Sequence, residues 1–178
     1  MPSTTCIIYS SVDGQTKKIC DRIRIILEDL GESVVMTSAT NLNQPQTILH
    51  QADKIILASS IRYGKHSKQI TTLIESYHGV LNSKISAFIS VNLVARKKEK
   101  SSFDTNPYVI KFLQSIPWKP TKTAVFAGKL NYPSYKFWDR FLIRLIMKLT
   151  KGPTDPNTVI EYTDWSAVEN FAKKWYQP

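Results

Sequence analysis

Near the N-terminus, residues 5–16 of the chain read TCIIYSSVDGQT. The apolar, β-branched run over 5–10 predicts a buried strand, and residues 15–30 repeat isoleucine and leucine at helical spacing until Gly31. A strand, a tight turn and a helix in this order bring the backbone N–H groups of the turn to a helix N-terminus, where an anion is stabilised. The turn at 10–16 therefore predicts a phosphate site, although a serine-rich turn with a capped helix remains the plain structural alternative.

The composition of this turn limits which phosphate it suits. It contains no Gly-Lys-Ser/Thr sequence and only one glycine, so it matches neither a Walker A motif nor the G-x-G-x-x-G of dinucleotide-binding folds. A turn rich in hydroxyls and free of lysine suits a phosphomonoester, which hydroxyls and amides can bind.

The rest of the chain continues the alternation of strand and helix. Further strands are predicted at 33–38, 54–60, 85–93 and 123–130, and further helices at 41–51, at 67–78, after 105–107 and after 163–164. Five βα units predict an α/β fold with a doubly wound, flavodoxin-like, five-stranded parallel sheet of order 2-1-3-4-5, whose ligand lies beyond the carboxyl ends of the strands. The length of 178 residues and the 42% hydrophobic content fit a single domain over 1–178.

Two more loops lie at the same predicted edge of the sheet as the phosphate turn. Residues 59–64, SSIRYG, follow the third strand, and residues 90–95, SVNLVA, follow the fourth. Tyr63 is placed to stack on a planar ring, and the backbone around Asn92 is placed to hydrogen-bond a ring edge. Ordinary packing at strand ends is the alternative.

The formal net charge of +10 predicts an anionic partner: nucleic acid, anionic lipid or an acidic substrate. No RNP, KH or zinc pattern is present, so nucleic acid is not expected, and the three histidines have no metal-ligand spacing. Cys6 and Cys20 are expected to be reduced core residues. The chain has no signal-like start and no run of about 20 apolar residues, so we expect it to be soluble or peripheral at a membrane.

Residues 131–161 are too long for an ordinary connection and predict a functional insertion. Within it, residues 132–151 predict an amphipathic helix with one broad apolar face and a basic stripe every four residues. Such a helix suits a membrane interface or a hydrophobic substrate, whereas packing of the apolar face on the domain is the structural alternative. The residues expected at the membrane are Phe137, Trp138, Arg140, Phe141, Arg144, Leu145 and Lys148.

Four motifs, SSxDGQT, SIRYG, SVNLVARK and YTDW, together resemble the menaquinone-dependent protoporphyrinogen IX dehydrogenase family, flavodoxin-like enzymes of bacterial haem biosynthesis. The likeness covers nearly the whole chain, including the insertion. It implies oxidation of protoporphyrinogen IX to protoporphyrin IX by bound FMN in three two-electron rounds. The implied acceptor is menaquinone or ubiquinone, and the implied location is peripheral, at the cytoplasmic face of the inner membrane.

The resemblance also implies which residues bind which group. The flavin carries the electron chemistry, so no general base is expected. Arg62, Arg96, Lys97 and Lys98 are candidates for the propionates of the substrate, with a solvated loop as the alternative for the last three. A flavodoxin-type electron carrier without a small substrate is the alternative function, but such carriers are generally acidic. The expected FMN-binding residues are Ser10, Ser11, Val12, Asp13, Gly14, Gln15, Thr16, Ile61, Arg62, Tyr63, Gly64, Ser90, Val91, Asn92 and Leu93.

Overall fold

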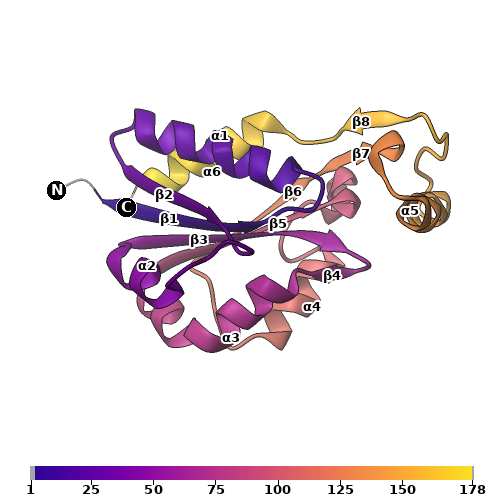
Figure 1. The fold of residues 1–178 in the computed structure, drawn as a ribbon. Helices are drawn as coiled ribbons and strands as arrows, with labels where there is room; N and C mark the ends of the chain where they lie inside the picture. The colour runs from indigo at the N-terminus through magenta and orange to yellow at the C-terminus, as the bar shows by residue number, and fades with distance from the viewer. Residues whose placement is uncertain (1–2, 178) are drawn as a thin grey trace.

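Five parallel strands form the central sheet of the protein (Figure 1). The computed structural model describes residues 3–177. The sheet order is β2-β1-β3-β5-β6, and the two-residue β4 (Lys65–His66) pairs antiparallel with β3 outside this path. The predicted order 2-1-3-4-5 is therefore confirmed for the parallel strands. These are β1 (Thr4–Ser10), β2 (Ser33–Ser38), β3 (Lys54–Arg62), β5 (Ile85–Asn92) and β6 (Lys122–Ala127).

Helices cover both faces of the sheet (Figure 1). Because successive side chains of a strand point to opposite faces, neighbouring residues of β1 enter different cores. Ile8 packs with α2, α3 and α4, while Ile7 packs with α1 and α6. Strands buried on both faces explain the continuous apolar runs in the sequence. The helices are α1 (Gln15–Asp29), α2 (Pro45–Gln51), α3 (Lys68–Ser83, kinked at Tyr77), α4 (Pro107–Ser115) and α6 (Trp165–Tyr176).

Several helix ends follow the predicted chemistry. The Asn106 side chain accepts hydrogen bonds from the first turn of α4, and Asp164 accepts one from the N–H of Ala167 at 3.0 Å in α6. Gly31 follows α1 with φ 91°, a conformation that favours glycine. Asn106 and Asp164 satisfy N–H groups that have no partner inside their own helices, and the N–H of Gly31 donates to the carbonyl of Glu28 at the end of α1.

The predicted fifth strand over 123–130 was wrong as a single element. The chain leaves the sheet at Gly128: β6 ends at Ala127, and β7 (Lys129–Asn131) begins a separate two-stranded antiparallel sheet with β8 (Val159–Glu161). Gly128 itself bridges the two sheets, because its N–H donates to Asn92 and its carbonyl accepts from Tyr162. The apolar pattern of the sequence continues through Gly128, so the pattern does not indicate that the strand ends there.

The insertion lies beyond the carboxyl ends of the parallel strands (Figure 1). The helix predicted over 132–151 is shorter than expected: a 3-10 turn, η3 (Tyr132–Ser134), precedes α5 (Phe137–Leu149). Two further 3-10 turns, η1 (Leu93–Arg96) and η2 (Lys98–Lys100), follow β5. The insertion has a small core of its own, formed by Leu130, Tyr132, Tyr135 and Met147.

Candidate functional site

The turn between β1 and α1 is built to hold an anion. Gly14 caps α1 with φ 83°, so the chain enters the helix directly from the turn. The hydroxyl oxygens of Ser11 and Thr16 are buried and have no hydrogen-bond partner within residues 3–177. A buried hydroxyl without a partner is costly, so two of them at a helix N-terminus fit a ligand such as a phosphate that binds both.

The start of α1 is fixed from a distant part of the chain. The Gln15 side chain donates to the hydroxyl of Thr163 at 2.9 Å, and Thr163 in turn donates to the carbonyl of Ala127 at 2.8 Å. These bonds connect the anion turn to the end of β6 and to the segment before α6. Gln15 thus positions the turn.

The motif after the third strand forms a hairpin. β3 runs on to Arg62, and the chain returns in β4 after the two residues Tyr63 and Gly64, which have φ values of 51° and 75°. Two consecutive positive φ values are typical of a type I′ turn, whose twist matches the paired strands. The hairpin holds Arg62 beside the anion turn, where its guanidinium donates to Asp13, and directs Tyr63 to Asp139 of α5.

Hydrogen bonds connect a half-buried histidine with buried polar side chains beneath the site. His66 Nε2 lies 2.8 Å from the hydroxyl of Ser90, which also accepts a bond from the Asn92 amide at 3.1 Å. The side-chain oxygen Oδ1 of Asn92 accepts from the Asn106 side-chain amide at 3.1 Å and from the N–H of Ala95 at 3.0 Å. Because each of these side chains has partners, the loop after β5 is held in one arrangement.

His66 has a structural environment. Its ring packs against Phe88 and Phe112, with centroid distances of 5.2 and 4.4 Å. Burial lowers the pKa of His66 from 6.5 to about 3, because the charged form loses its hydration. The imidazole is therefore neutral near pH 7 and orders Ser90 beneath the site.

The anion turn, the hairpin and the loop after β5 enclose one cleft with α5. It contains about 940 Å³ of non-atom space, its open mouth included. Of the residues expected to bind cofactor, Ser10, Val12, Gly14 and Ser90 do not line it, and Ser90 lies buried behind it. The expected residues that line it are Ser11, Asp13, Gln15, Thr16, Ile61, Arg62, Tyr63, Gly64, Val91, Asn92 and Leu93.

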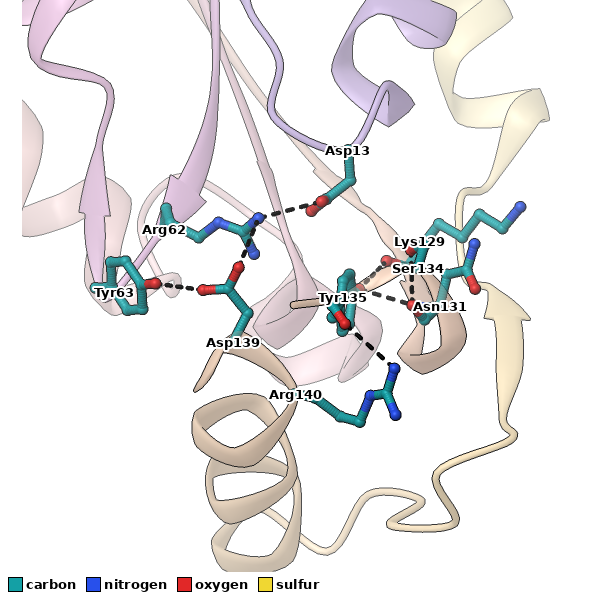
Figure 2. A network of polar contacts seen from close by, with 9 residues as sticks. All are labelled: Asp13, Arg62, Tyr63, Lys129, Asn131, Ser134, Tyr135, Asp139 and Arg140. Atoms are coloured by element: carbon teal, nitrogen blue, oxygen red, sulfur yellow. Dashed lines mark hydrogen bonds and ion pairs between the residues drawn. The ribbon is translucent and has the colours of Figure 1, made fainter. Parts of the chain in front are cut away.

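One polar network joins three walls of the cleft (Figure 2). Arg62 donates to the Asp13 carboxylate at 3.2 Å and lies 3.8 Å from the carboxylate of Asp139 in α5. The Tyr63 hydroxyl donates to the other oxygen of Asp139, and this bond raises the pKa of Tyr63. The Arg62 guanidinium also lies over the ring of Tyr135, 5.9 Å from its centroid. The network fastens the insertion across the cleft.

Sequence reasoning missed the residues that the insertion contributes to this cleft. Asp139, Leu142, Ile143 and Ile146 of α5 line it, and so does Tyr135; Tyr108 of α4, outside the insertion, was missed as well. One signal was present for Asp139: it is the single acidic residue among five basic ones in 132–151. An acid in the first turn of a helix is stabilised by the helix dipole.

The four cations expected to bind propionates differ in their position relative to the cleft. Arg62 and Arg96 line the cleft, whereas Lys97 and Lys98 do not. The Arg96 guanidinium donates to the carbonyl of Leu93 at 2.9 Å and to the hydroxyl of Thr150 at 2.8 Å, so it holds the end of α5. Binding of a propionate by any of the four stays a prediction.

The apolar face of α5 points to solvent. Phe137 and Trp138 are 74% and 71% exposed, and Phe141 and Leu145 are also exposed. The alternative in which this face packs on the domain is therefore wrong. Two cations of the predicted stripe have partners within the insertion, because Arg140 donates to the carbonyl of Tyr135 and Arg144 to that of Thr154; Lys148 is exposed.

Residues 3–177 contain no group of His, Cys, Asp or Glu side chains able to hold a metal ion. No helix in this part of the chain is long and apolar enough to cross a membrane.

Comparisons with known proteins agree with this geometry. A family model described as a flavodoxin domain matches residues 6–157. The chain is 41% identical over 170 residues to protoporphyrinogen IX dehydrogenase (quinone) of Escherichia coli strain K12, covering 96% of this chain and 93% of that protein. The chain belongs to the protoporphyrinogen IX dehydrogenase (quinone) family. A family member from Leishmania major is 43% identical over 172 residues, which cover 96% of this chain and 74% of that protein.

Solved flavodoxins share the fold of this family member at low sequence identity. Oxidised flavodoxin 1 from Bacillus cereus superposes with a TM-score of 0.57 at 14% identity, with 97% of each chain covered. The flavodoxin of Streptococcus pneumoniae TIGR4 gives 0.56 at 18% identity, again with 97% of each covered. The domain, the fold and the unpartnered hydroxyls of the anion turn together support a flavin cofactor.

Proposed function

We propose that this protein oxidises protoporphyrinogen IX to protoporphyrin IX with bound FMN and transfers the electrons to a membrane quinone. The supporting observation is the cleft beyond the strand ends, in a chain 41% identical to a protoporphyrinogen IX dehydrogenase over nearly its full length. Each substrate molecule gives up six electrons and six protons, so three quinones become three quinols.

FMN fits the residues that line the cleft. Ser11 and Thr16, whose buried hydroxyls have no partner at the N-terminus of α1 within residues 3–177, would hold the phosphate, and the hairpin and residues 91–93, which line the cleft, would hold the ring. A single-glycine turn favours one phosphate over a dinucleotide. When bound, the flavin supplies two-electron transfer between the substrate and the quinone.

The chain's own residues position these groups and limit access to them. The network of Asp13, Arg62, Tyr63 and Asp139 holds α5 across the cleft, and apolar side chains of α5 reduce the water around the ring. Of the predicted cations, Arg62 and Arg96 line the cleft, so these two are the ones placed to attract a propionate.

Membrane contact is the second part of the proposal. The outward apolar face of α5, with exposed Lys136, Lys148 and Lys151 near its two ends, suits anionic headgroups and acyl chains. We place the protein peripherally at the cytoplasmic face of the inner membrane, with menaquinone or ubiquinone as acceptor. In this proposal residues 1–178 form one domain that includes the insertion.

Turnover tests the enzymatic part. The purified holoprotein should form fluorescent protoporphyrin from protoporphyrinogen IX faster than autoxidation, and only when a quinone is supplied. Denaturation should release FMN and not FAD. A flavin-loaded protein that shows no quinone-dependent gain would contradict the enzyme assignment and favour an electron carrier.

Vesicle binding tests the membrane part, with a matched pair of exposed phenylalanines. Phe141 of α5 is 56% exposed, and Phe103, outside the insertion, is 52% exposed. F141S should weaken sedimentation with phosphatidylglycerol vesicles several-fold, and F103S should leave it unchanged. Equal vesicle binding by both variants would show that α5 is not the membrane contact.

A further inference from the structure

Two side chains of α5 belong to both the surface and the interior of the protein. Leu142 and Ile146 are 37% and 41% exposed, and both line the cleft proposed to hold the flavin. They lie one helical turn apart, so they form a single apolar edge along the cleft mouth. A ligand that touches them is in contact with solvent or lipid on one side and with the cleft on the other.

The helical geometry shows how this edge joins the exposed face. At about 100° per residue, Leu145 lies about 60° around the helix from Leu142 and is exposed, whereas Ile143 and Met147 lie on the inner side of Ile146. An apolar arc therefore runs from the outer face of α5, over Leu142 and Ile146, to Ile143 in the cleft, and Asp139 in the first turn is the one polar residue of the helix at that angle. The basic residues lie on the other flank of the helix.

The aliphatic edge suits one of the two proposed substrates better than the other. A tetrapyrrole carries two propionates and requires cations, and no basic side chain lies on the Leu142 side of α5. The isoprenoid tail of a quinone is purely apolar and remains in the membrane while its ring reacts. An apolar path from the proposed membrane face to the cleft matches such a tail.

We propose, on the basis of the function proposed above, that Leu142 and Ile146 form a portal through which the isoprenoid tail of the quinone passes from the membrane to the flavin cleft. These residues determine specificity for tailed over tail-less quinones. The quinone ring enters the cleft along the flank of α5, and the tail remains on the outer face.

The test compares menadione, which has no tail, with menaquinone-4 in detergent micelles, so that membrane binding does not limit the rate. In L142S/I146S the KM for menaquinone-4 should rise about tenfold more than the KM for menadione, since branched side chains of this size discriminate ligands by such factors. Because both residues also line the cleft, both KM values are measured with saturating FMN, and the ratio of the two KM values is the readout. Quenching of tryptophan fluorescence by each quinone gives the matching dissociation constants without turnover.

Two controls separate the portal from general surface effects. Ile25 and Leu30 at the far end of α1 are 40% and 39% exposed, which matches the portal pair, and I25S/L30S should leave both KM values unchanged. L145S/L149S on the outer face should raise the KM for menaquinone-4 less than the portal variant does.

Each result has a distinct meaning. Equal KM increases for both quinones in L142S/I146S, or an equal effect of L145S/L149S, would overturn the portal. Wild-type protein that turns over neither quinone would instead contradict the proposed function, and the quenching constants would still show whether the tail contacts Leu142 and Ile146.

Discussion

Replacing Thr16 by valine should affect the empty and the flavin-loaded protein in opposite directions. Thr16 is 1% exposed, and its hydroxyl has no partner within residues 3–177. Valine has nearly the same shape and the same β-branching, so the substitution removes the hydroxyl with little other change. The free protein loses a buried polar atom that nothing satisfies, and the complex loses a ligand contact.

The size of each effect follows from what the Thr16 hydroxyl does in the flavin-free protein and in the FMN complex. An unsatisfied buried hydroxyl costs about 1–3 kcal/mol, so T16V should raise the unfolding free energy of the flavin-free protein by about 1 kcal/mol. A hydrogen bond to a charged phosphate contributes about 1.5–3 kcal/mol, so the dissociation constant for FMN should rise roughly 10- to 100-fold. Riboflavin, which has no phosphate, should bind both proteins equally.

Thr5 provides the matched control. It is also fully buried, but its hydroxyl accepts a hydrogen bond from the Trp175 indole N–H at 3.1 Å. T5V should therefore lower the unfolding free energy by about 1–3 kcal/mol, because the indole N–H loses its partner, and leave FMN affinity unchanged. Urea unfolding of the flavin-free proteins and fluorescence titration with FMN measure all four quantities.

Two outcomes would refute this reasoning. If T16V destabilises the flavin-free protein as much as T5V does, the Thr16 hydroxyl is satisfied and is not held for a ligand. If T16V leaves the FMN constant unchanged, the phosphate binds elsewhere and the turn at 10–16 is only structural.

Three further predictions concern titration, thiol reactivity and the insertion. Burial lowers the pKa of His66 to about 3, so only the unfolded chain binds this proton as the pH falls from about 6.5 to 3. In this pH range the wild type should lose up to about 1.4 kcal/mol of unfolding free energy per pH unit. The H66Q variant should show a shallower loss, measured by urea unfolding at acid pH. Burial raises the pKa of the Cys6 thiol to about 12 and also raises the pKa of the Cys20 thiol. Ellman's reagent should therefore label neither thiol until the protein is unfolded. Prompt labelling of the folded protein would contradict their burial. D139N removes the charge that faces Arg62, so limited proteolysis within 132–160 should become faster. The free energy of global unfolding should change by at most about 1 kcal/mol. An unchanged cleavage rate would show that the network does not hold α5.

The sheet and the anion turn were predictable because local patterns specify them. Runs of β-branched residues over 5–10 and 54–60 give buried parallel strands, and Gly14 and Gly31 mark where helices begin and end. Caps such as Asn106 and Asp164 act within one turn of their own helix. Each of these signals is local in the sequence, although the bond from Gln15 to Thr163 that fixes the start of α1 is not.

The cleft wall formed by the insertion was not predictable in the same way. Asp139 contacts Arg62 and Tyr63 across 76 residues or more of sequence, and no local pattern encodes that pairing. Arg96 illustrates the same limit: its basic neighbours indicated a substrate cation, whereas its actual partner, Thr150, lies 54 residues away. The break at Gly128 also depends on a distant strand, because β7 exists only by pairing with β8.

The contacts at the two ends of α5 determine how a substrate can reach the cleft. The first turn is held by Asp139 through Arg62 and Tyr63, and the last turn is held by Arg96 through Thr150. Gly152 packs against this second end, where an added Cβ would lie 2.5 Å from the terminal methyl group of Met147. A helix fastened at both ends cannot swing away as a hinged lid without breaking one of these contacts. Entry along its open apolar flank requires neither contact to break, which is why we assign access to Leu142 and Ile146.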